Sequence, residues 1–146
     1  MFSKEESAKI RKEFWTSFGK SFPRKWLLYN TNIKGFTFKF VADRKKAMIC
    51  LDFEHPDEIA NELLYDQLLA LKNILLTEYL SDVIYDEAYE LQESGKIIRR
   101  IYIEHQTKFS IHNKNTWRDC YEFFVEKMSK FEGFFYEYED IIKQAI

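Results

Sequence analysis

Two neighbouring segments in which apolar residues occupy alternate positions constrain this sequence most. Residues 36–42 and 47–53 both show the alternation, and the charged turn 43–46 separates them. If Ala42 lies opposite Ala47, the cross-strand pairs on one face are all apolar: Phe40 with Ile49, Phe38 with Leu51, and Phe36 with Phe53. A shift of one residue would mix the two faces. The pattern therefore predicts an antiparallel hairpin of fixed register, with Lys39 and Asp52 on its polar face.

Two further segments are expected to be extended. Residues 83–91 and 96–104 flank a Ser94-Gly95 turn and predict a second hairpin. In the register that places Glu93 opposite Lys96, Glu90 would face Arg99 as a matched charge pair. The short apolar run at residues 26–29 is suited to one more strand, ahead of the first hairpin.

Three helices are predicted from apolar periodicity. The first, residues 3–22, has Ser3 as its N-cap and an apolar stripe at Ile10, Phe14, Phe18 and Phe22. The second, residues 56–81, has a broad inner face consisting of Ile59, Leu63, Leu64, Leu68, Leu71 and Leu75. The third, residues 116–145, has a heptad-like seam consisting of Trp117, Tyr121, Phe124, Met128, Phe131, Phe135, Tyr138 and Ile142.

The predicted element order is α-β-β-β-α-β-β-α, which is a single α+β domain over residues 1–146. Two antiparallel hairpins would form one sheet, packed by long N-terminal, central and C-terminal helices. The two longer helices have more apolar surface than one neighbour needs. Burial inside the domain is one explanation, and self-association through helix 56–81 or helix 116–145, giving a homodimer, is the other.

Composition and the chain's start predict a cytoplasmic protein without a membrane partner. Hydrophobic residues make up 46% of the chain and charged residues 32%, as in globular proteins. The charged N-terminus has no apolar leader segment, and no apolar run approaches the ~18 residues of a membrane span. Cys50 and Cys120 stand apart in apolar stretches, so we expect two reduced, buried thiols and no disulfide framework.

Motifs that carry chemistry are scarce. The sequence has no glycine-rich phosphate loop, H-E-x-x-H, C-x-x-C or G-x-S-x-G motif. The tightest acidic and histidine cluster is Asp52, Glu54 and His55. Because residues two apart on a strand share a face, Asp52 and Glu54 could bind Mg²⁺ as part of a metal-dependent hydrolase. The alternative is that they form an ordinary polar strand face, with Asp52 paired to Lys39. On that alternative neither a metal nor another cofactor is expected.

The order helix, three strands, helix and strand also occurs in the restriction-endonuclease-like nuclease core. That core requires an acidic-x-Lys pattern, in which the lysine neutralises the scissile phosphate. This sequence has Asp52 and Glu54 at the two positions and no lysine at the second. Any relationship would therefore be to an inactive form, and topology alone is a weak argument for function.

Charge is unevenly distributed along the chain. Residues 1–46 contain 12 Lys/Arg and 4 Asp/Glu, a net charge of +8, and the remaining residues have a net charge of −10. The candidate nucleic-acid-binding residues in the basic part are Lys20, Arg24, Lys25, Trp26 and Lys34. Cations would neutralise phosphates and Trp26 would stack on a base. The alternative is a solvated face without a partner.

Several aromatic segments resemble one bacterial family. They are Phe14-Trp15 with Phe18, Lys25-Trp26-Leu27-Leu28-Tyr29 ahead of Gly35-Phe36-Thr37-Phe38, Tyr65-Asp66-Gln67-Leu68, Asn115-Thr116-Trp117, Phe123 to Met128, and Phe131-Glu132 with Phe135. Together they resemble the domain-of-unknown-function family numbered 4268, over most of the chain. The resemblance implies a bacterial intracellular protein, associated in some family members with a nuclease-like domain. It implies no functional residue.

We therefore expect a non-catalytic intracellular interaction or accessory module, with a homodimer as one form. The first alternative is a nucleic-acid-binding accessory domain related to restriction or defence nucleases. The second alternative is a metal-dependent hydrolase at Asp52, Glu54 and His55.

Overall fold

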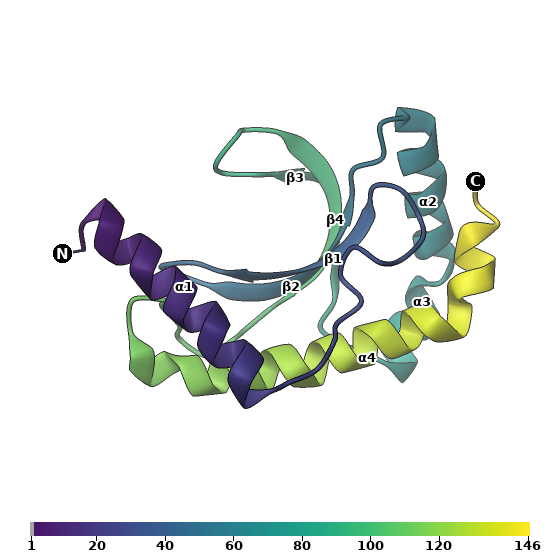
Figure 1. Cartoon of the computed structure of the whole chain (residues 1–146). Coiled ribbons are helices and arrows are strands. Elements are labelled where there is room, and N and C mark those ends of the chain that lie inside the picture. The colour runs from purple at the N-terminus through teal and green to yellow at the C-terminus, as the bar shows by residue number, and fades with distance from the viewer. Residues whose placement is uncertain (1) are drawn as a thin grey trace.

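The computed structural model describes residues 2–146, which form a curved antiparallel sheet with helices on its convex side (Figure 1). The strands lie in the order β1-β2-β4-β3. The elements are α1 (Lys4–Ser21), β1 (Phe36–Ala42), β2 (Ala47–Phe53), α2 (Glu58–Ala70), α3 (Lys72–Glu78), β3 (Ile84–Glu90), β4 (Ile97–Glu104), a 3-10 turn (Lys114–Thr116) and α4 (Trp117–Lys143). The predicted α+β class is confirmed.

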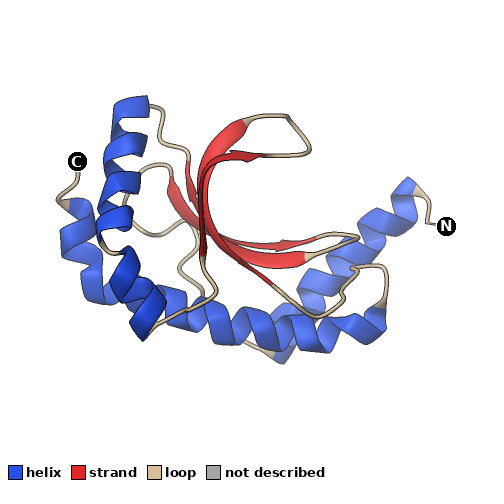
Figure 2. Cartoon of the chain, turned by 180° about the vertical axis from the view of Figure 1, so that it is seen from behind, coloured by secondary structure: helices blue, strands red, loops and turns tan. Residues whose placement is uncertain are grey.

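The two faces of the sheet are covered differently. In Figure 2 the strands form an arc, with α1, α2 and α4 on its outer side. No helix of residues 2–146 covers the inner, concave side. Within the same residues, no helix combines the length and the apolar character needed to cross a membrane.

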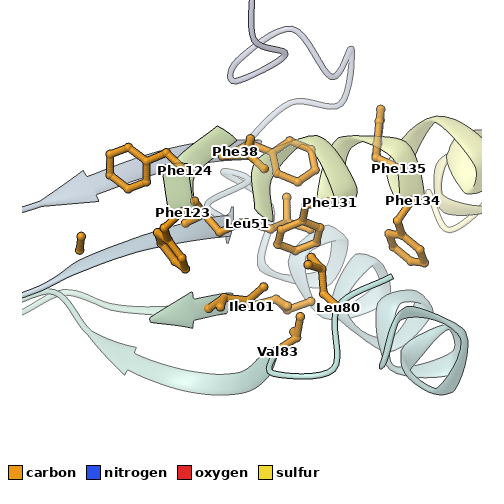
Figure 3. Close-up of a cluster of buried hydrophobic side chains, with 14 of the residues drawn as sticks. Phe38, Leu51, Leu80, Val83, Ile101, Phe123, Phe124, Phe131, Phe134 and Phe135 are labelled. Carbon is orange, nitrogen blue, oxygen red and sulfur yellow. The ribbon is translucent and has the colours of Figure 1, made fainter. Parts of the chain in front are cut away.

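The first hairpin has the predicted register throughout. Ala42 lies opposite Ala47, and Phe36 lies opposite Phe53. The apolar face of this hairpin packs on α4, as the alternation requires (Figure 3). All seven residues of β2 are buried, including those on the polar face.

The C-terminal helix α4 covers the convex face with aromatic side chains. The ring centroids of Phe131 and Phe38 are 5.1 Å apart, and those of Phe124 and Phe40 are 4.8 Å apart. Figure 3 shows aromatic rings of α4, among them Phe124 and Phe131, on the side of the sheet that carries Leu51 and Ile101. Seven of the eight predicted seam positions are buried, and the eighth, Tyr138, is half-buried. The apolar seam of α4 is therefore buried inside the domain as part of its hydrophobic core.

The N-terminal helix α1 packs its predicted stripe against α4. Ser3 caps α1 by accepting a hydrogen bond from Glu6 N at 3.1 Å. Phe14 is fully buried, with its ring 5.2 Å from that of Trp117, and its carbonyl accepts a hydrogen bond from the Tyr121 hydroxyl at 2.7 Å.

The segment between α1 and β1 contains no strand, contrary to the prediction for residues 26–29. Leu28 adopts a positive φ of 41°, which an extended strand does not allow. Its carbonyl accepts a hydrogen bond from Phe38 N at 3.0 Å, so the segment contacts the edge of β1 without forming a ladder. Among residues 2–146, two strands rather than three precede α2. The predicted order common to this chain and the restriction-endonuclease-like core is therefore absent.

The predicted central helix is divided at Leu71 into α2 and α3. Leu64, Leu68, Leu71 and Leu75 are buried as predicted. Ile59 and Leu63 were predicted on the same inner face, but α2 turns them outward. The reason is that α2 buries the neighbouring stripe, which consists of Ala60, Asn61, Leu64, Tyr65 and Leu68.

The second hairpin differs from its predicted register. Glu90 lies opposite Ile97 rather than Arg99, and the turn spans the bond from Leu91 N to Lys96 O. A bulge between Asp86 and Tyr89 then shifts the pairing again. The physical reason is that local alternation specifies neither turn length nor bulges, and a bulge moves later side chains to the other face.

Candidate functional site

The concave face of the sheet carries a network of charged side chains, which we call the concave-face network. Its members are Lys39 of β1, Asp52 of β2, Arg100 of β4, and Glu54 and Lys96 at its margin. Strand pairing brings them together, because Asp52 lies opposite Arg100 on one side and Thr37 on the other. The predicted pairing of Asp52 with Lys39 is confirmed.

Asp52 is the centre of this network. It is fully buried, and Arg100 is only 4% exposed. Arg100 Nε donates to Asp52 Oδ1 at 2.7 Å, and Nη2 donates to Oδ2 at 2.9 Å, which is the bidentate geometry of a strong ion pair. Lys39 Nζ lies 3.2 Å from Asp52 Oδ2. Both carboxylate oxygens of Asp52 are therefore engaged by cations.

The aromatic ring of Tyr89 packs against the guanidinium group of Arg100. The guanidinium carbon of Arg100 lies 4.4 Å from the centroid of the Tyr89 ring, and Lys46 Nζ donates to the Tyr89 hydroxyl at 3.3 Å. Burial alone lowers the pKa of Arg100, but the hydrogen-bonded carboxylate of Asp52 outweighs burial and raises it. Arg100 is therefore a permanent, sequestered cation.

Glu54 links two lysines at the margin of the network. Its Oε2 accepts from Lys39 Nζ at 3.0 Å, and its Oε1 accepts from Lys96 Nζ at 3.4 Å. Burial would raise the pKa of Glu54, but the hydrogen bond and charge of Lys39, with a contribution from Lys96, lower it. For Lys39, burial lowers the pKa, and Glu54 and Asp52 together raise it. Each group stabilises the ionised form of its partner.

His55 belongs to the start of α2 rather than to the network. Its backbone N donates to Asn61 Oδ1 at 2.7 Å, and its Nδ1 accepts from Asp57 N at 2.9 Å. Gly35 lies against the same backbone with φ +69°, and a Cβ there would be 2.3 Å from His55 N. Glu54 and His55 line a pocket of about 490 Å³ between α2 and the start of β4.

The three residues predicted to bind a metal therefore make different contacts and have different structural roles. Asp52 is enclosed by Arg100 and Lys39, Glu54 bridges two lysines, and His55 shapes a turn. Within residues 2–146 there is no group of three His, Cys, Asp or Glu side chains that could hold a metal ion.

The predicted nucleic-acid-binding residues are also divided. Lys20, Lys25 and Lys34 are exposed. Arg24 instead donates to Glu132 Oε1 at 2.9 Å, and its guanidinium lies 4.2 Å from the centroid of the Trp26 ring. This cluster fastens the α1–β1 segment to α4.

Helix α2 carries a surface that we call the outer face of α2, consisting of Ile59, Glu62, Leu63 and Asp66. Ile59 is 67% exposed and Leu63 is 45% exposed. These two residues are four positions apart and are therefore neighbours on the helix surface. Gln67, one turn beyond Leu63, donates to Ile141 O at 2.7 Å and brings the end of α4 beside this face.

Sequence reasoning assigned no structural role to three residues that hold the site together. Arg100 becomes the partner of Asp52 only through pairing of strands that lie 48 positions apart. Tyr89 reaches the concave face through the bulge. Glu132 is 2% exposed, and the sequence signal for its burial is a charged residue between apolar positions of α4.

These features define a small α+β domain whose buried charged side chains, Asp52, Arg100 and Glu132, each have an ion-pair partner. The family model described as Domain of unknown function (DUF4268) matches residues 10–139, and the chain belongs to that family. No curated protein matches the chain, and no solved structure does.

Proposed function

We propose that this chain is a non-catalytic interaction module that binds a partner protein through the outer face of α2. The observation that carries the proposal is the exposure of Ile59 and Leu63 on a helix whose other side is in the core. Covering an exposed Ile or Leu side chain contributes about 1–2 kcal/mol to binding. Two adjacent residues of this kind can form the centre of a small interface.

The engagement of the reactive side chains supports the same proposal. Asp52 is neutralised by Arg100 and Lys39. The thiols of Cys50 and Cys120 are buried, and burial raises the pKa of both, so neither is available as a thiolate nucleophile. We place the module in the cytoplasm, and two free, buried thiols support that placement.

The proposal is tested with the double variant Ile59→Ser/Leu63→Ser. The partner is either a second copy, which gives a homodimer, or a different protein. Light scattering over a concentration series detects the first, and affinity capture from the native host followed by mass spectrometry detects the second. We expect the double variant to lose the interaction that the wild type shows.

Ile97→Ser is the matched control, because Ile97 is 63% exposed but lies at the start of β4. It should retain the interaction. The free energy of unfolding of both variants should lie within about 0.5 kcal/mol of the wild-type value, since the changes are at the surface. A wild-type chain that is monomeric at every concentration and captures the same proteins as the double variant would contradict the proposal.

A second candidate function is nucleic-acid binding by the basic first third of the chain. It is supported by Lys20, Lys25 and Lys34, which are exposed and form no ion pair within residues 2–146. Affinity for DNA or RNA at low salt should fall steeply as salt rises, and Lys20→Ala/Lys25→Ala should reduce the salt dependence. Absence of binding at low salt removes this candidate, and the proposed link to restriction or defence nucleases with it.

A further inference from the structure

The charges around the outer face of α2 identify the chemistry of its partner, on the basis of the function proposed above. Every charged residue in the segment from Asp57 to Leu71 is acidic. Glu58 is paired with Arg99, and Asp57 caps the helix by accepting from Ile59 N at 3.0 Å. The remaining two, Glu62 and Asp66, are exposed and have no ion-pair partner within residues 2–146.

The neighbouring end of α4 has the same sign of charge. Glu137 and Asp140 are exposed there, and Lys143 is paired with Glu139 at 2.6 Å. Ile141, held beside α2 by its hydrogen bond with Gln67, is 41% exposed. Figure 1 shows the end of α4 running alongside α2. The apolar side chains are therefore set in acidic surroundings on both helices.

We infer that the outer face of α2 binds a basic amphipathic helix of another protein. Such a helix would cover Ile59 and Leu63 with its own apolar side chains at i and i+4, and its lysines or arginines would pair with Glu62 and Asp66. Desolvating those carboxylates without a cationic partner would oppose binding. The partner helix therefore needs positive charges opposite Glu62 and Asp66 as well as an apolar stripe opposite Ile59 and Leu63.

A second copy of this chain is a poor occupant. Pairing two α2 helices would bring Glu62 and Asp66 of both copies together, and like charges at an interface disfavour association. The basic helix α1 has the right charge, but its large apolar residues form the stripe that packs against the core. Its exposed side offers no aliphatic pair to cover Ile59 and Leu63.

The test uses the full chain and a synthetic probe. The probe is a lactam-bridged helical peptide of 13 residues, the length of α2, with leucines at i and i+4 flanked by lysines. Its binding is measured by fluorescence anisotropy at low salt. A second peptide has glutamate at every lysine position. We expect the lysine peptide to bind, with affinity falling as salt is raised, and the glutamate peptide not to bind.

Variants assign the binding to this face. Ile59→Ser/Leu63→Ser and Glu62→Lys/Asp66→Lys should each weaken binding about tenfold or more. The charge control is Glu93→Lys/Glu122→Lys, two exposed acids in the β3–β4 turn and on α4, and it should bind like the wild type. The inference is overturned if the lysine peptide fails to bind the wild type. It is also overturned if that peptide binds the charge-reversed α2 variant and the charge control equally well.

The outcomes also separate this inference from the proposed function. A concentration-dependent dimer that Ile59→Ser/Leu63→Ser abolishes would keep the interaction module and overturn the basic partner. Equal binding of the lysine and glutamate peptides would do the same, because docking would then be independent of charge. If neither peptide binds and the wild type forms no complex that the double serine variant loses, the proposed function and the inference both fail.

Discussion

The two faces of the sheet are built from different interactions. The convex face is held by aromatic and aliphatic packing against α4, and its pattern of alternation is visible in the sequence. The concave face is held by a buried ion pair and its neighbours, which only the assembled sheet brings together. Apolar packing tolerates substitution by other apolar side chains of similar volume, since many of them can fill the same space in the core. The buried ion pair depends on individual atoms, because an unpaired buried charge is strongly unfavourable.

Removing one aromatic ring from the convex face should have the largest effect on stability. Phe131 is fully buried against Phe38, and Phe135 lies one turn away. Phe131→Ala should lower the free energy of unfolding by about 4 kcal/mol, through lost burial and the cavity left behind. Urea denaturation followed by circular dichroism measures this. Tyr29→Ala, at an exposed position, is the control and should change stability by less than about 0.5 kcal/mol.

Breaking the ion pair on the concave face should have a somewhat smaller effect. Asp52→Ala leaves Arg100 buried without its carboxylate, and we expect a loss of about 3 kcal/mol. The double variant Asp52→Leu/Arg100→Met removes both charges and should recover most of that loss. A double variant as unstable as the single one would show that specific hydrogen bonds, rather than charge balance, hold this face.

Glu54 at the margin of the network should contribute less and in a pH-dependent way. Its pKa is lowered in the folded state, so ionised Glu54 stabilises the fold above about pH 4.5, and this contribution is lost as the pH falls through the folded-state pKa. Glu54→Gln should lower stability by about 0.5 kcal/mol at neutral pH. The difference between Glu54→Gln and wild type should shrink in acid. A difference that is constant from pH 7 to about pH 3 would contradict the assignment.

The smallest expected effect concerns His105, where β4 meets α4. Its ring lies 4.8 Å from that of Phe123, and its buried Nε2 has no hydrogen-bond partner within residues 2–146. Burial lowers the pKa of His105, and the charge of Asp119 only partly offsets this. Stability should therefore fall as the pH drops below about 6.5, because the unfolded chain takes up the proton first. His105→Gln should flatten the stability profile between about pH 5 and 6.5, as read from urea midpoints.

The same contrast explains what the sequence could predict. The register of β1 with β2 follows from the alternation together with the short turn 43–46, because a shift of one residue would mix the apolar and polar faces. The α4 seam likewise follows from its spacing. The strand expected at residues 26–29 was wrong, since a short apolar run does not reveal that Leu28 has a positive φ. The register of β3 with β4 was wrong because the turn is longer than expected and the strand contains a bulge.

The candidate site was predictable only where its contacts are local. Lys39 is the diagonal neighbour of Asp52 on the same face of one hairpin, so the sequence predicts their pairing. Arg100 comes from the second hairpin, and no local pattern indicates which strand of that hairpin will pair with β2. Ile59 and Leu63 were expected in the core because their spacing fits a broad stripe. Which part of a broad stripe is buried depends on the angle at which the helix meets the sheet.

The position of α4 along the chain also bears on how the protein is made. Every strand is synthesised before Trp117–Lys143, so the phenylalanines of the first hairpin leave the ribosome before the helix that covers them exists. Until α4 packs against it, the apolar face of the nascent sheet is exposed to solvent and can bind other apolar surfaces. We expect chaperones that hold unfinished chains to bind this protein during translation and release it once α4 has docked.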